Sequence, residues 1–432
     1  SCMIAHRLRC RTSVRGYLLL LIFVLSSASG GHCSKMKAQT KPQKSVAAKQ
    51  QNSMSELDRY FVNVYGSKRW SELREALEKP TEHVAWINPF CDFQEQTASR
   101  LLGEEKIFDA SVWKLVRYSD KFSFMVQRDD VPSDIKVNMP PPAPIGLRQL
   151  HSHYVLDGAS PLPAISLRAA PGSRVLDICA APGGKSLVIA GGLFDVETSG
   201  AKSMLTSNDR SQPRRDRLLQ VMREYIPAEL LKNAASKDSG SYQRKFQGIL
   251  SVTGVDATLW GRSPATCGCF DRILVDAPCS SERHIVHGSS GSSWTHSRLK
   301  RDAKLQGQIL QSAIRVLNPN GGRLVYSTCS IAPEENDEVI SKIINNSRLA
   351  KGLKILDPLV ELQHEALGGL LQGVERTKYG AIMLPDKSKY GPLYWCVMEK
   401  TISGAAGTAW LESESDSDSE NQSGESSEGQ EE

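Results

Sequence analysis

The segment Val175-Leu-Asp-Ile-Cys-Ala-Ala-Pro-Gly-Gly-Lys-Ser186 decides the fold that we expect for this chain. Its apolar start is typical of a buried strand, the Gly183-Gly184 pair of a tight turn, and Lys185-Ser186 of a helix start. Such a turn brings backbone N–H groups close to a ligand and points a helix N-terminus at it. The segment also ends like an ATP-binding P-loop, but that motif needs a glycine where Cys179 stands. It therefore predicts a cofactor-binding loop rather than an ATPase loop.

Apolar runs of strand length alternate with helical patterns from residue 174 onward. Near-continuous apolar strands between helices predict an α/β fold, with a mostly parallel sheet covered by helices on both faces. In such a sheet, ligands bind beyond the carboxyl ends of the strands. The expected strands are 174–179, 204–208, 248–253, 272–275, 323–327 and 393–397, and the expected helices are 185–190, 213–225, 299–317 and 333–344.

The 432 residues divide by composition into four parts. Residues 1–55 hold nine Lys or Arg and no Asp or Glu, and we interpret them as a targeting segment and linker. Residues 56–144 are expected to form a smaller, mainly helical module of RNA-binding type, and residues 145–400 the main domain. The acidic, serine-rich composition of residues 401–432 predicts a disordered tail. The sequence has no apolar run of about 18 residues, so no membrane partner is expected.

Two aspartates follow two of the predicted strands. Asp209 comes 25 residues after Gly184, where a carboxylate that binds a ribose is expected. Asp256 follows the next strand, in a place from which it would reach an adenine amino group. Each aspartate alone is equally well explained as a helix N-cap. Together, at successive strand ends, they favour a nucleoside ligand.

Two cysteines follow two further strands, in Asp276-Ala-Pro-Cys279 and Ser327-Thr-Cys329-Ser330. A buried cysteine is usually inert packing. Here each cysteine lies in a polar loop at the edge where a ligand is expected. Lys185 is a source of positive charge that would favour a thiolate there. Both cysteines are therefore candidates for a nucleophile.

Methylation of carbon 5 of cytosine is a reaction that requires such residues. Carbon 5 is a poor nucleophile until a thiolate adds to carbon 6, helped by an acid at ring N3. The resulting enamine attacks the methyl group of a sulfonium. A base then removes the proton at carbon 5, so that the thiol can leave. The reaction therefore needs a nucleophilic cysteine, an acid close to the ring and S-adenosylmethionine.

Three motifs resemble those of the NOL/SUN-domain RNA cytosine-5 methyltransferases: Asp177-Ile-Cys-Ala-Ala-Pro-Gly-Gly-Lys185, Asp271-Arg-Ile-Leu-Val-Asp-Ala-Pro-Cys279 and Tyr326-Ser-Thr-Cys-Ser330. The resemblance extends from about Ser152 to Lys400, with the motifs in one order, and is greatest to the mitochondrial members. Asn208-Asp209-Arg210 and Arg283-His284 favour the ribosomal-RNA type over the transfer-RNA type. The resemblance implies a Rossmann-like sheet of seven strands and S-adenosylmethionine as the cofactor.

The resemblance also implies a role for each motif residue. Cys329 would be the nucleophile, Asp276 would hold ring N3 and the amino group, and Cys279 would assist product release. DNA cytosine methyltransferases use the Pro-Cys thiol itself as the nucleophile, so the presence of both cysteines points to RNA. The residues expected around the cofactor are Cys179, Ala180, Ala181, Pro182, Gly183, Gly184, Lys185, Asp209, Arg214, Asp256 and Asp276, with Lys185 near the target base.

The expected partner is RNA, with ribosomal RNA favoured over transfer RNA, and the family resemblance adds a helical-repeat protein of the mitochondrial termination-factor type. The N-terminal segment fits either a mitochondrial transit peptide or a secretory signal. An RNA-modifying enzyme with a nucleophilic thiol has no clear role in an oxidising lumen, so we expect a mitochondrial location. Cys267 and Cys269 lack a second Cys/His pair, so no metal site is expected.

Two other functions remain open at this point. One is a non-catalytic RNA-binding or ribosome-assembly factor that keeps the fold and the cofactor pocket, although two thiols at the crevice argue against it. The other is a methyltransferase that acts on a small molecule or a protein. RNA contacts are less distinct, because Trp70, Trp86, Trp113 and Trp294 could stack on bases but are better explained by core packing.

Overall fold

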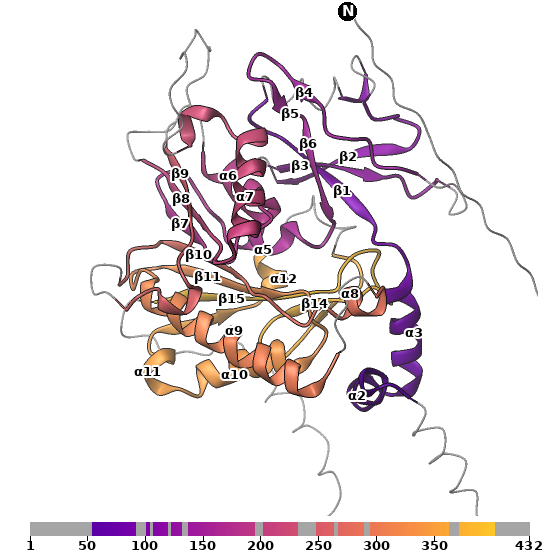
Figure 1. Ribbon diagram of the computed structural model, residues 1–432, viewed down its shortest axis with the longest axis vertical. Helices are drawn as coiled ribbons and strands as arrows, with labels where there is room; N and C mark the ends of the chain where they lie inside the picture. The colour runs from indigo at the N-terminus through magenta and orange to yellow at the C-terminus, as the bar shows by residue number, and fades with distance from the viewer. Residues whose placement is uncertain are drawn as a thin grey trace, which may run out of the picture. The chain divides into compact units, whose positions relative to one another are not determined.

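The computed structural model describes residues 54–91, 101–103, 107–119, 122–131, 137–194, 202–231, 248–262, 267–288, 294–362 and 371–401 (Figure 1). Nearly all of the predicted targeting segment, 1–55, and of the predicted tail, 401–432, lies outside the described residues. Within the part of the chain that the structure describes, no helix is both long enough and apolar enough to cross a membrane.

The main sheet is built around the strand that precedes the Gly183-Gly184 turn. Its strands are β7 (Arg174–Asp177), β8 (Met204–Asn208), β9 (Ile249–Thr253), β10 (Arg272–Asp276), β11 (Arg323–Thr328), β12 (Leu353–Leu356), β13 (Val374–Arg376), β14 (Ala381–Met383) and β15 (Leu393–Lys400). Parallel pairing joins β9, β8, β7, β10 and β11 in that order. The antiparallel β15 pairs with β11, and both β12 and β14 pair with β15.

The order β9-β8-β7-β10-β11-β15-β12 is the seven-stranded Rossmann-like sheet that the family resemblance implied. The hairpin of β13 and β14 extends it to nine strands, because β14 pairs with residues 393–395 of β15 while β12 pairs with residues 397–400. All six strands expected from apolar runs are present. The strands that the sequence did not indicate, β12, β13 and β14, have only three or four residues each.

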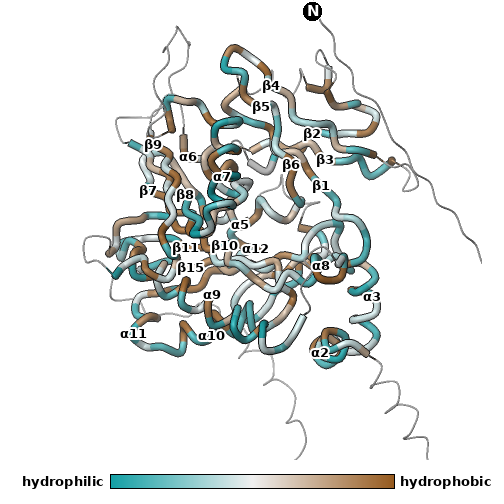
Figure 2. Tube along the Cα trace, in the orientation of Figure 1, coloured by the Kyte–Doolittle hydropathy of each residue, from teal (hydrophilic) through white to brown (hydrophobic). Residues whose placement is uncertain are grey.

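Helices cover both faces of this sheet, as predicted (Figure 1). The helices α6 (Gly184–Leu193) and α7 (Gln212–Tyr225) share a core with Val175 on one face. The helices α9 (His296–Val316) and α10 (Asp337–Ile344) share a second core with Leu176 on the other. Successive residues of a strand point to opposite faces, so these two neighbours enter different cores. Figure 2 shows several strands of the main sheet as largely hydrophobic segments.

The predicted helix 333–344 is divided in two by Asn336. A short 3₁₀ turn, η4 (Pro333–Glu335), precedes the break and α10 follows it. The Asn336 side chain accepts a hydrogen bond from Thr328 Oγ1 at 2.6 Å and donates one to the Ser330 carbonyl at 2.9 Å. These two bonds hold the backbone on both sides of Cys329, the predicted nucleophile.

The N-terminal module is mixed, and the prediction of a mainly helical module is wrong for its second half. Two helices are present as predicted, α2 (Glu56–Tyr65) and α3 (Ser67–Glu78), separated at Gly66 by a φ of +78°. Three strands then follow: β1 (His83–Ile87), β2 (Trp113–Ser119) and β3 (Phe122–Gln127). The helical periodicity of the first part does not extend to these short antiparallel strands. The strands β2 and β3 pair with each other, and β1 pairs with β3 and with a second partner further along the chain.

That partner is β6 (His153–Asp157), which pairs with the whole of β1 in the four-stranded antiparallel sheet β2-β3-β1-β6. Along the chain, a small hairpin of β4 (Pro144–Ile145) and β5 (Leu150–His151) precedes β6. The module and the main domain are therefore joined by strand pairing as well as by sequence. The four tryptophans Trp70, Trp86, Trp113 and Trp294 are all at most 5% exposed, which agrees with core packing.

Candidate active site

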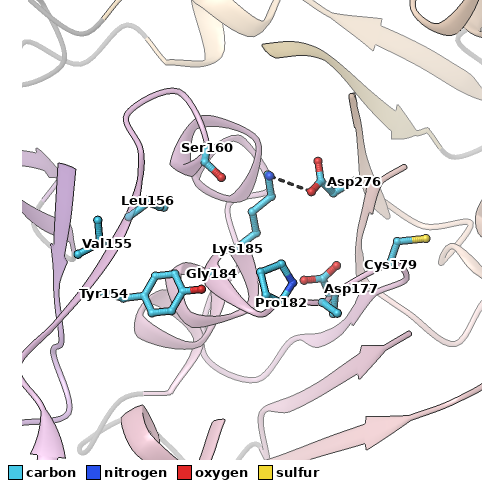
Figure 3. A pocket seen from close by; sticks show the side chains of 12 residues that line it. Tyr154, Val155, Leu156, Ser160, Asp177, Cys179, Pro182, Gly184, Lys185 and Asp276 are labelled. Atoms are coloured by element: carbon cyan, nitrogen blue, oxygen red, sulfur yellow. Dashed lines mark hydrogen bonds and ion pairs between the residues drawn. The ribbon is translucent and has the colours of Figure 1, made fainter. Parts of the chain in front are cut away.

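The loop after β7 forms the floor of a cavity of about 200 Å³ at the carboxyl edge of the sheet (Figure 3). Seven residues predicted for the cofactor line it: Cys179, Ala180, Ala181, Pro182, Gly184, Lys185 and Asp276. Tyr154 and Ser160, which precede the first strand of the main sheet, complete the opposite wall. The structure therefore brings together most of the predicted set.

The two glycines of the turn allow close packing that no side chain would permit. Gly183 has a φ of +122°, and a Cβ atom there would lie 3.0 Å from Met222 Cε and 3.1 Å from Leu218 Cδ1 on α7. A Cβ atom at Gly184 would lie 2.8 Å from Cε1 of the Tyr154 ring. The absence of side chains leaves the backbone of the turn and the first residues of α6 open to the cavity, as the sequence predicted.

Asp177 is a cavity residue that the sequence analysis did not select. It is fully buried, and its Oδ2 accepts a hydrogen bond from Ser186 Oγ at 2.7 Å. Its Oδ1 has no hydrogen-bond partner within the described structure. Burial raises the pKa of this carboxyl to about 7, with a further increase from Asp276. An unpaired buried acceptor on a cavity wall fits a ligand that carries a hydrogen-bond donor. Its position at the end of the first strand was the available signal.

Asp209 and Arg214 lie next to the loop but do not line the cavity. Asp209, at the end of β8, is almost fully buried and pairs with Arg214 across 3.3 Å. Arg214, on α7, also donates a hydrogen bond to the Ala181 carbonyl at 2.5 Å. The guanidinium group of Arg214 therefore connects Asp209 to the turn.

Asp256 makes the contacts of a helix N-cap, the alternative that the sequence left open. It precedes a short 3₁₀ turn, η2 (Ala257–Leu259), and accepts hydrogen bonds from the Thr258 backbone N–H at 3.0 Å and the Thr258 hydroxyl at 2.8 Å. Arg210 forms an ion pair with it at 3.1 Å. The hydrogen bonds from Thr258 lower the pKa of Asp256. Its predicted contact with an adenine amino group stays a prediction.

Asn208 joins the ends of three strands and was selected from the sequence only as part of a family motif. Its side-chain amide donates to the Ile178 carbonyl at 3.0 Å and to the Val255 carbonyl at 2.9 Å. Its Oδ1 accepts from the Val255 N–H and from Thr253 Oγ1, both at 2.8 Å. A single buried amide therefore fixes the loops after β7 and β9 to the end of β8.

We expect Asn208→Ala to destabilise the fold by about 1–3 kcal/mol, because the buried Ile178 carbonyl and the partly buried carbonyl and N–H of Val255 would lose their partner. Chemical denaturation measures this change. Asn345→Ala is the matched control, since Asn345 is an exposed residue at the end of α10, and it should change the free energy of unfolding by less than about 0.5 kcal/mol. Equal effects of the two substitutions would contradict the assignment.

Asp276 and Lys185 form the charged pair at the centre of the site. Lys185 Nζ lies 2.8 Å from Asp276 Oδ2, and Ser327 Oγ donates to Asp276 Oδ1 at 2.8 Å (Figure 3). Burial alone would lower the pKa of Lys185, but the charge of Asp276 outweighs it and raises the pKa overall. The charge of Cys329 contributes to the same increase in the pKa of Lys185.

The two predicted thiols face each other. Cys279 Sγ and Cys329 Sγ lie 3.0 Å apart, and both cysteines are free. Ser281 Oγ lies 3.1 Å from Cys329 Sγ and 3.4 Å from Cys279 Sγ. A hydrogen bond from Cys279 lowers the pKa of Cys329, and the same bond together with burial raises the pKa of Cys279. This asymmetry favours a thiolate at position 329 and a thiol at position 279.

A second cavity, of about 270 Å³, opens on the Cys329 side of the pair. It shares Ser160 and Lys185 with the first cavity, so the two are neighbours. Its other lining residues include Cys329, Ser281 and His284 from the thiol loops, Thr81 and His83 from the N-terminal module, and Asp157, Arg283 and Gly391. The thiol loops and the N-terminal module thus form walls of one chamber.

Arg283 ties these walls together. Its Nη1 donates to Thr81 Oγ1 at 3.1 Å and to the Gly391 carbonyl at 2.5 Å. Asp157 in turn accepts a hydrogen bond from the Gly391 N–H at 3.2 Å. The sequence had marked Arg283 only as part of a family motif, and it gave no signal for Thr81. Within the described residues, no group of three or more His, Cys, Asp or Glu has the geometry of a metal site.

Ser281→Gly should slow alkylation of Cys329 by iodoacetamide about tenfold at pH 7, because the hydroxyl is a hydrogen-bond donor to the thiolate. The backbone of Ser281 has a φ of +54°, a conformation that glycine adopts readily, so the loop should keep its path. Mass spectrometry of the Cys329 peptide gives the rate. Ser281→Ala should slow alkylation equally. If Ser281→Ala slows alkylation and Ser281→Gly does not, the cause is backbone strain in the alanine variant and not loss of the hydroxyl.

Comparison with known proteins supports the assignment from the motifs. Residues 164–368 match the family described as 16S rRNA methyltransferase RsmB/F. The chain is 31% identical over 264 residues to 5-cytosine rRNA methyltransferase NSUN4 of Bos taurus, covering 60% of this chain and 62% of the bovine protein. It is 28% identical over 400 residues to the mitochondrial tRNA (cytosine(34)-C(5))-methyltransferase of Danio rerio, covering 87% of this chain and 96% of the fish protein.

The fold is shared with solved structures. A methyltransferase homologue from Pyrococcus horikoshii has a TM-score of 0.55 at 20% identity, covering 83% of this chain and all of the archaeal one. NSun6 from the same organism, determined with SFG, has a TM-score of 0.54 at 17% identity, covering 81% and 99%. At these identities the similarity concerns the fold alone. The motif order and the match over residues 164–368 confirm the resemblance of this chain to the RsmB/F, or NOL/SUN-domain, methyltransferases.

Proposed function

We propose that the protein transfers a methyl group from S-adenosylmethionine to carbon 5 of a cytosine in RNA, through a transient bond between Cys329 Sγ and carbon 6 of the ring. The observation that carries this proposal is the pair of free thiols 3.0 Å apart, of which Cys329 lines a chamber that Lys185 also lines. A thiolate, a hydrogen-bonded thiol and an acid–base pair are the groups that the reaction requires.

The first cavity fits the cofactor of this family. S-adenosylmethionine supplies an electrophilic methyl group when it is bound. Two observations support the fit: the turn at Gly183 and Gly184 has no room for side chains, and Asp177 Oδ1 is a buried acceptor without a partner among the described residues. We propose that residues 179–185 with Asp276 hold this group, and that Asp209, Arg214 and Asp256 extend the site along the edge of the sheet.

The protein residues divide the remaining steps among themselves. Cys329, as the thiolate, adds to carbon 6, while a proton held on the Lys185–Asp276 pair neutralises ring N3. After the methyl group has reached carbon 5, a base takes the proton from that carbon and the carbon–sulfur bond breaks, while ring N3 returns its proton to the Lys185–Asp276 pair. Cys279 then donates its proton to the departing Cys329 sulfur, a role that its hydrogen bond to that atom supports.

The substrate that we favour is mitochondrial ribosomal RNA. The NSUN4 relatives are named as rRNA methyltransferases, which supports ribosomal RNA, and the tRNA relatives are named as mitochondrial, which supports the location. The alternative is mitochondrial transfer RNA, and the nearly complete coverage of the fish enzyme favours it. Bisulfite sequencing of mitochondrial RNA with and without the gene distinguishes these two substrates. We also propose a helical-repeat partner of the mitochondrial termination-factor type, which co-purification with the tagged protein would test.

A non-catalytic RNA-binding or assembly factor is the main rival function. Incubation with labelled S-adenosylmethionine and mitochondrial RNA separates the two, because only an enzyme leaves label in the RNA. Label that survives RNase treatment would indicate a protein or small-molecule substrate instead. The low pKa of the Cys329 thiol argues for the enzyme, since a scaffold has no use for a thiolate.

Cys329→Ala should abolish methyl transfer, to below about one thousandth of the wild-type rate, because no other group can add to carbon 6. Transfer of label to RNA is the measurement. Cys396→Ala is the matched control. This cysteine is buried on β15, the strand that pairs with β11, so its replacement should affect stability more than turnover. Residual transfer near the wild-type rate in Cys329→Ala would exclude the proposed nucleophile.

Cys279→Ala should leave the protein covalently attached to RNA, because addition proceeds while release of Cys329 loses its proton donor. A shifted band on a denaturing gel that disappears after RNase treatment detects this complex. The double variant Cys279→Ala with Cys329→Ala should show no such band. If Cys329→Ala alone gives the band, the roles of the two thiols are exchanged.

A further inference from the structure

A pair of buried carboxylates without a part in the proposed mechanism lies next to the two thiol loops. Glu282 follows Cys279 by three positions and Glu335 follows Cys329 by six, and both side chains are fully buried. Over the described residues, neither carboxylate has an ion pair with a lysine, arginine or histidine. Charged groups in such an environment are costly unless hydrogen bonds or protons compensate them.

Each carboxylate reaches across to the loop of the other. Glu335, beyond the Cys329 loop, accepts hydrogen bonds from the Ser280 N–H at 3.1 Å and 3.2 Å and from Ser280 Oγ at 2.6 Å. Glu282, in the Cys279 loop, accepts one from the Ile331 N–H at 3.1 Å. The two glutamates therefore form a reciprocal clamp between the loops that carry the thiols.

A glutamine on α9 supports the clamp from the other side. Gln306 donates from Nε2 to Glu335 Oε1 at 3.1 Å and to the Pro278 carbonyl at 2.9 Å. The hydroxyl of Tyr326 donates to the Glu335 backbone carbonyl at 2.6 Å. The position of Glu335 is thus fixed relative to the backbone immediately before Cys279.

The hydroxyl of Ser280 connects the two carboxylates and imposes a proton count. Ser280 Oγ is in hydrogen-bond contact with Glu282 Oε1 and with Glu335 Oε2. It has one proton to donate, so it can satisfy only one of these oxygens. The other contact is favourable only if that carboxyl is protonated and donates to Ser280 Oγ. The arrangement therefore needs one additional proton on the glutamate pair.

We propose that Glu282, Ser280 and Glu335 share one proton, and that this clamp positions Cys329 against Cys279. For its effect on methyl transfer the inference rests on the proposed function. Glu282 and Glu335 are positioning residues, because they act through the loops. When the shared proton is lost, two negative charges face each other through one hydroxyl, and the loops are expected to separate.

The titratable groups around the two glutamates all favour protonation of the pair. Glu282 faces Tyr60, Tyr65 and Cys329, and Glu335 faces Tyr326 and Cys279. These groups are neutral or anionic, so none of them replaces the proton. Burial, followed by the charge of Glu282, raises the pKa of Glu335 to about 7, and burial also raises the pKa of Glu282. A raised pKa means that the stabilising proton is present at low pH and is lost as the pH increases through about 7.

Oxidation of the two thiols to a disulfide by diamide reports loop position without any methyl transfer. In the wild-type full chain, we expect the rate of Cys279–Cys329 disulfide formation, corrected for thiol ionisation with free cysteine, to fall as the pH rises through about 7. Glu335→Gln supplies a permanent amide donor, so this fall should disappear. Glu335→Ala should slow disulfide formation about tenfold and lower kcat about tenfold with KM for RNA unchanged.

Glu334→Ala is the matched control, because this neighbouring glutamate bonds to Tyr60 and not to the thiol loops, and it should behave as wild type. Infrared spectroscopy provides a second test, in which Glu335→Gln or Glu282→Gln removes a protonated-carboxyl band that Asp177→Asn leaves in place. A wild-type pH dependence in Glu335→Gln, or no band lost in either glutamine variant, would overturn the inference. If Glu335→Ala does not fold, these two glutamine variants still decide. If wild-type protein does not methylate RNA, the disulfide and infrared results remain valid, so the two failures are distinguishable.

Discussion

The parallel pairing of β10 with β11 is the constraint on which the site depends. In this register Asp276 lies beside Ser327, so the loops after the two strands begin side by side. Cys279 and Cys329 then follow at nearly equal distances from the sheet, and their sulfurs meet. A shift of one residue in either strand would turn alternate side chains to the other face and separate the thiols. The reactive pair is thus a product of backbone hydrogen bonding.

Lys185 is the cation at the centre of the site. Lys185 lines both cavities and compensates Asp276, while the nearby Asp177 remains buried without an ion pair of its own in the described structure. The carboxylates behind the thiol loops have no cation at all within the described residues. Negative charge near the thiols would oppose formation of a thiolate, and the hydrogen bonds from Cys279 and Ser281 offset that effect at Cys329. These hydrogen bonds favour the thiolate at Cys329, which is also the thiol that lines the chamber.

Much of the fold could be predicted because the central strands are buried on both faces and so appear as apolar runs in the sequence. The Gly183-Gly184 turn and the two cysteines could also be predicted, because each belongs to a short motif of consecutive residues that directly follows one of these strands. The strands β1, β2 and β3 were missed because they are short antiparallel segments held by pairing, and one partner of β1, the strand β6, lies about seventy residues beyond it. The roles of Asn208, Asp177 and Glu335 depend on which distant backbone groups they meet, and no local pattern encodes that. For Asp256 the sequence left open a nucleoside contact and an N-cap, and its observed contacts are those of an N-cap, which depends only on neighbouring residues.

The pairing of β1 with β6 has a consequence for the shape of the chamber. His83 and Asp157 are opposite each other in this ladder, and both line the chamber that contains Cys329. A slip of the ladder by one residue would turn both side chains to the opposite face of the small sheet. The outline of the space beside Cys329 therefore depends on strand alignment in the small sheet as well as in the main one.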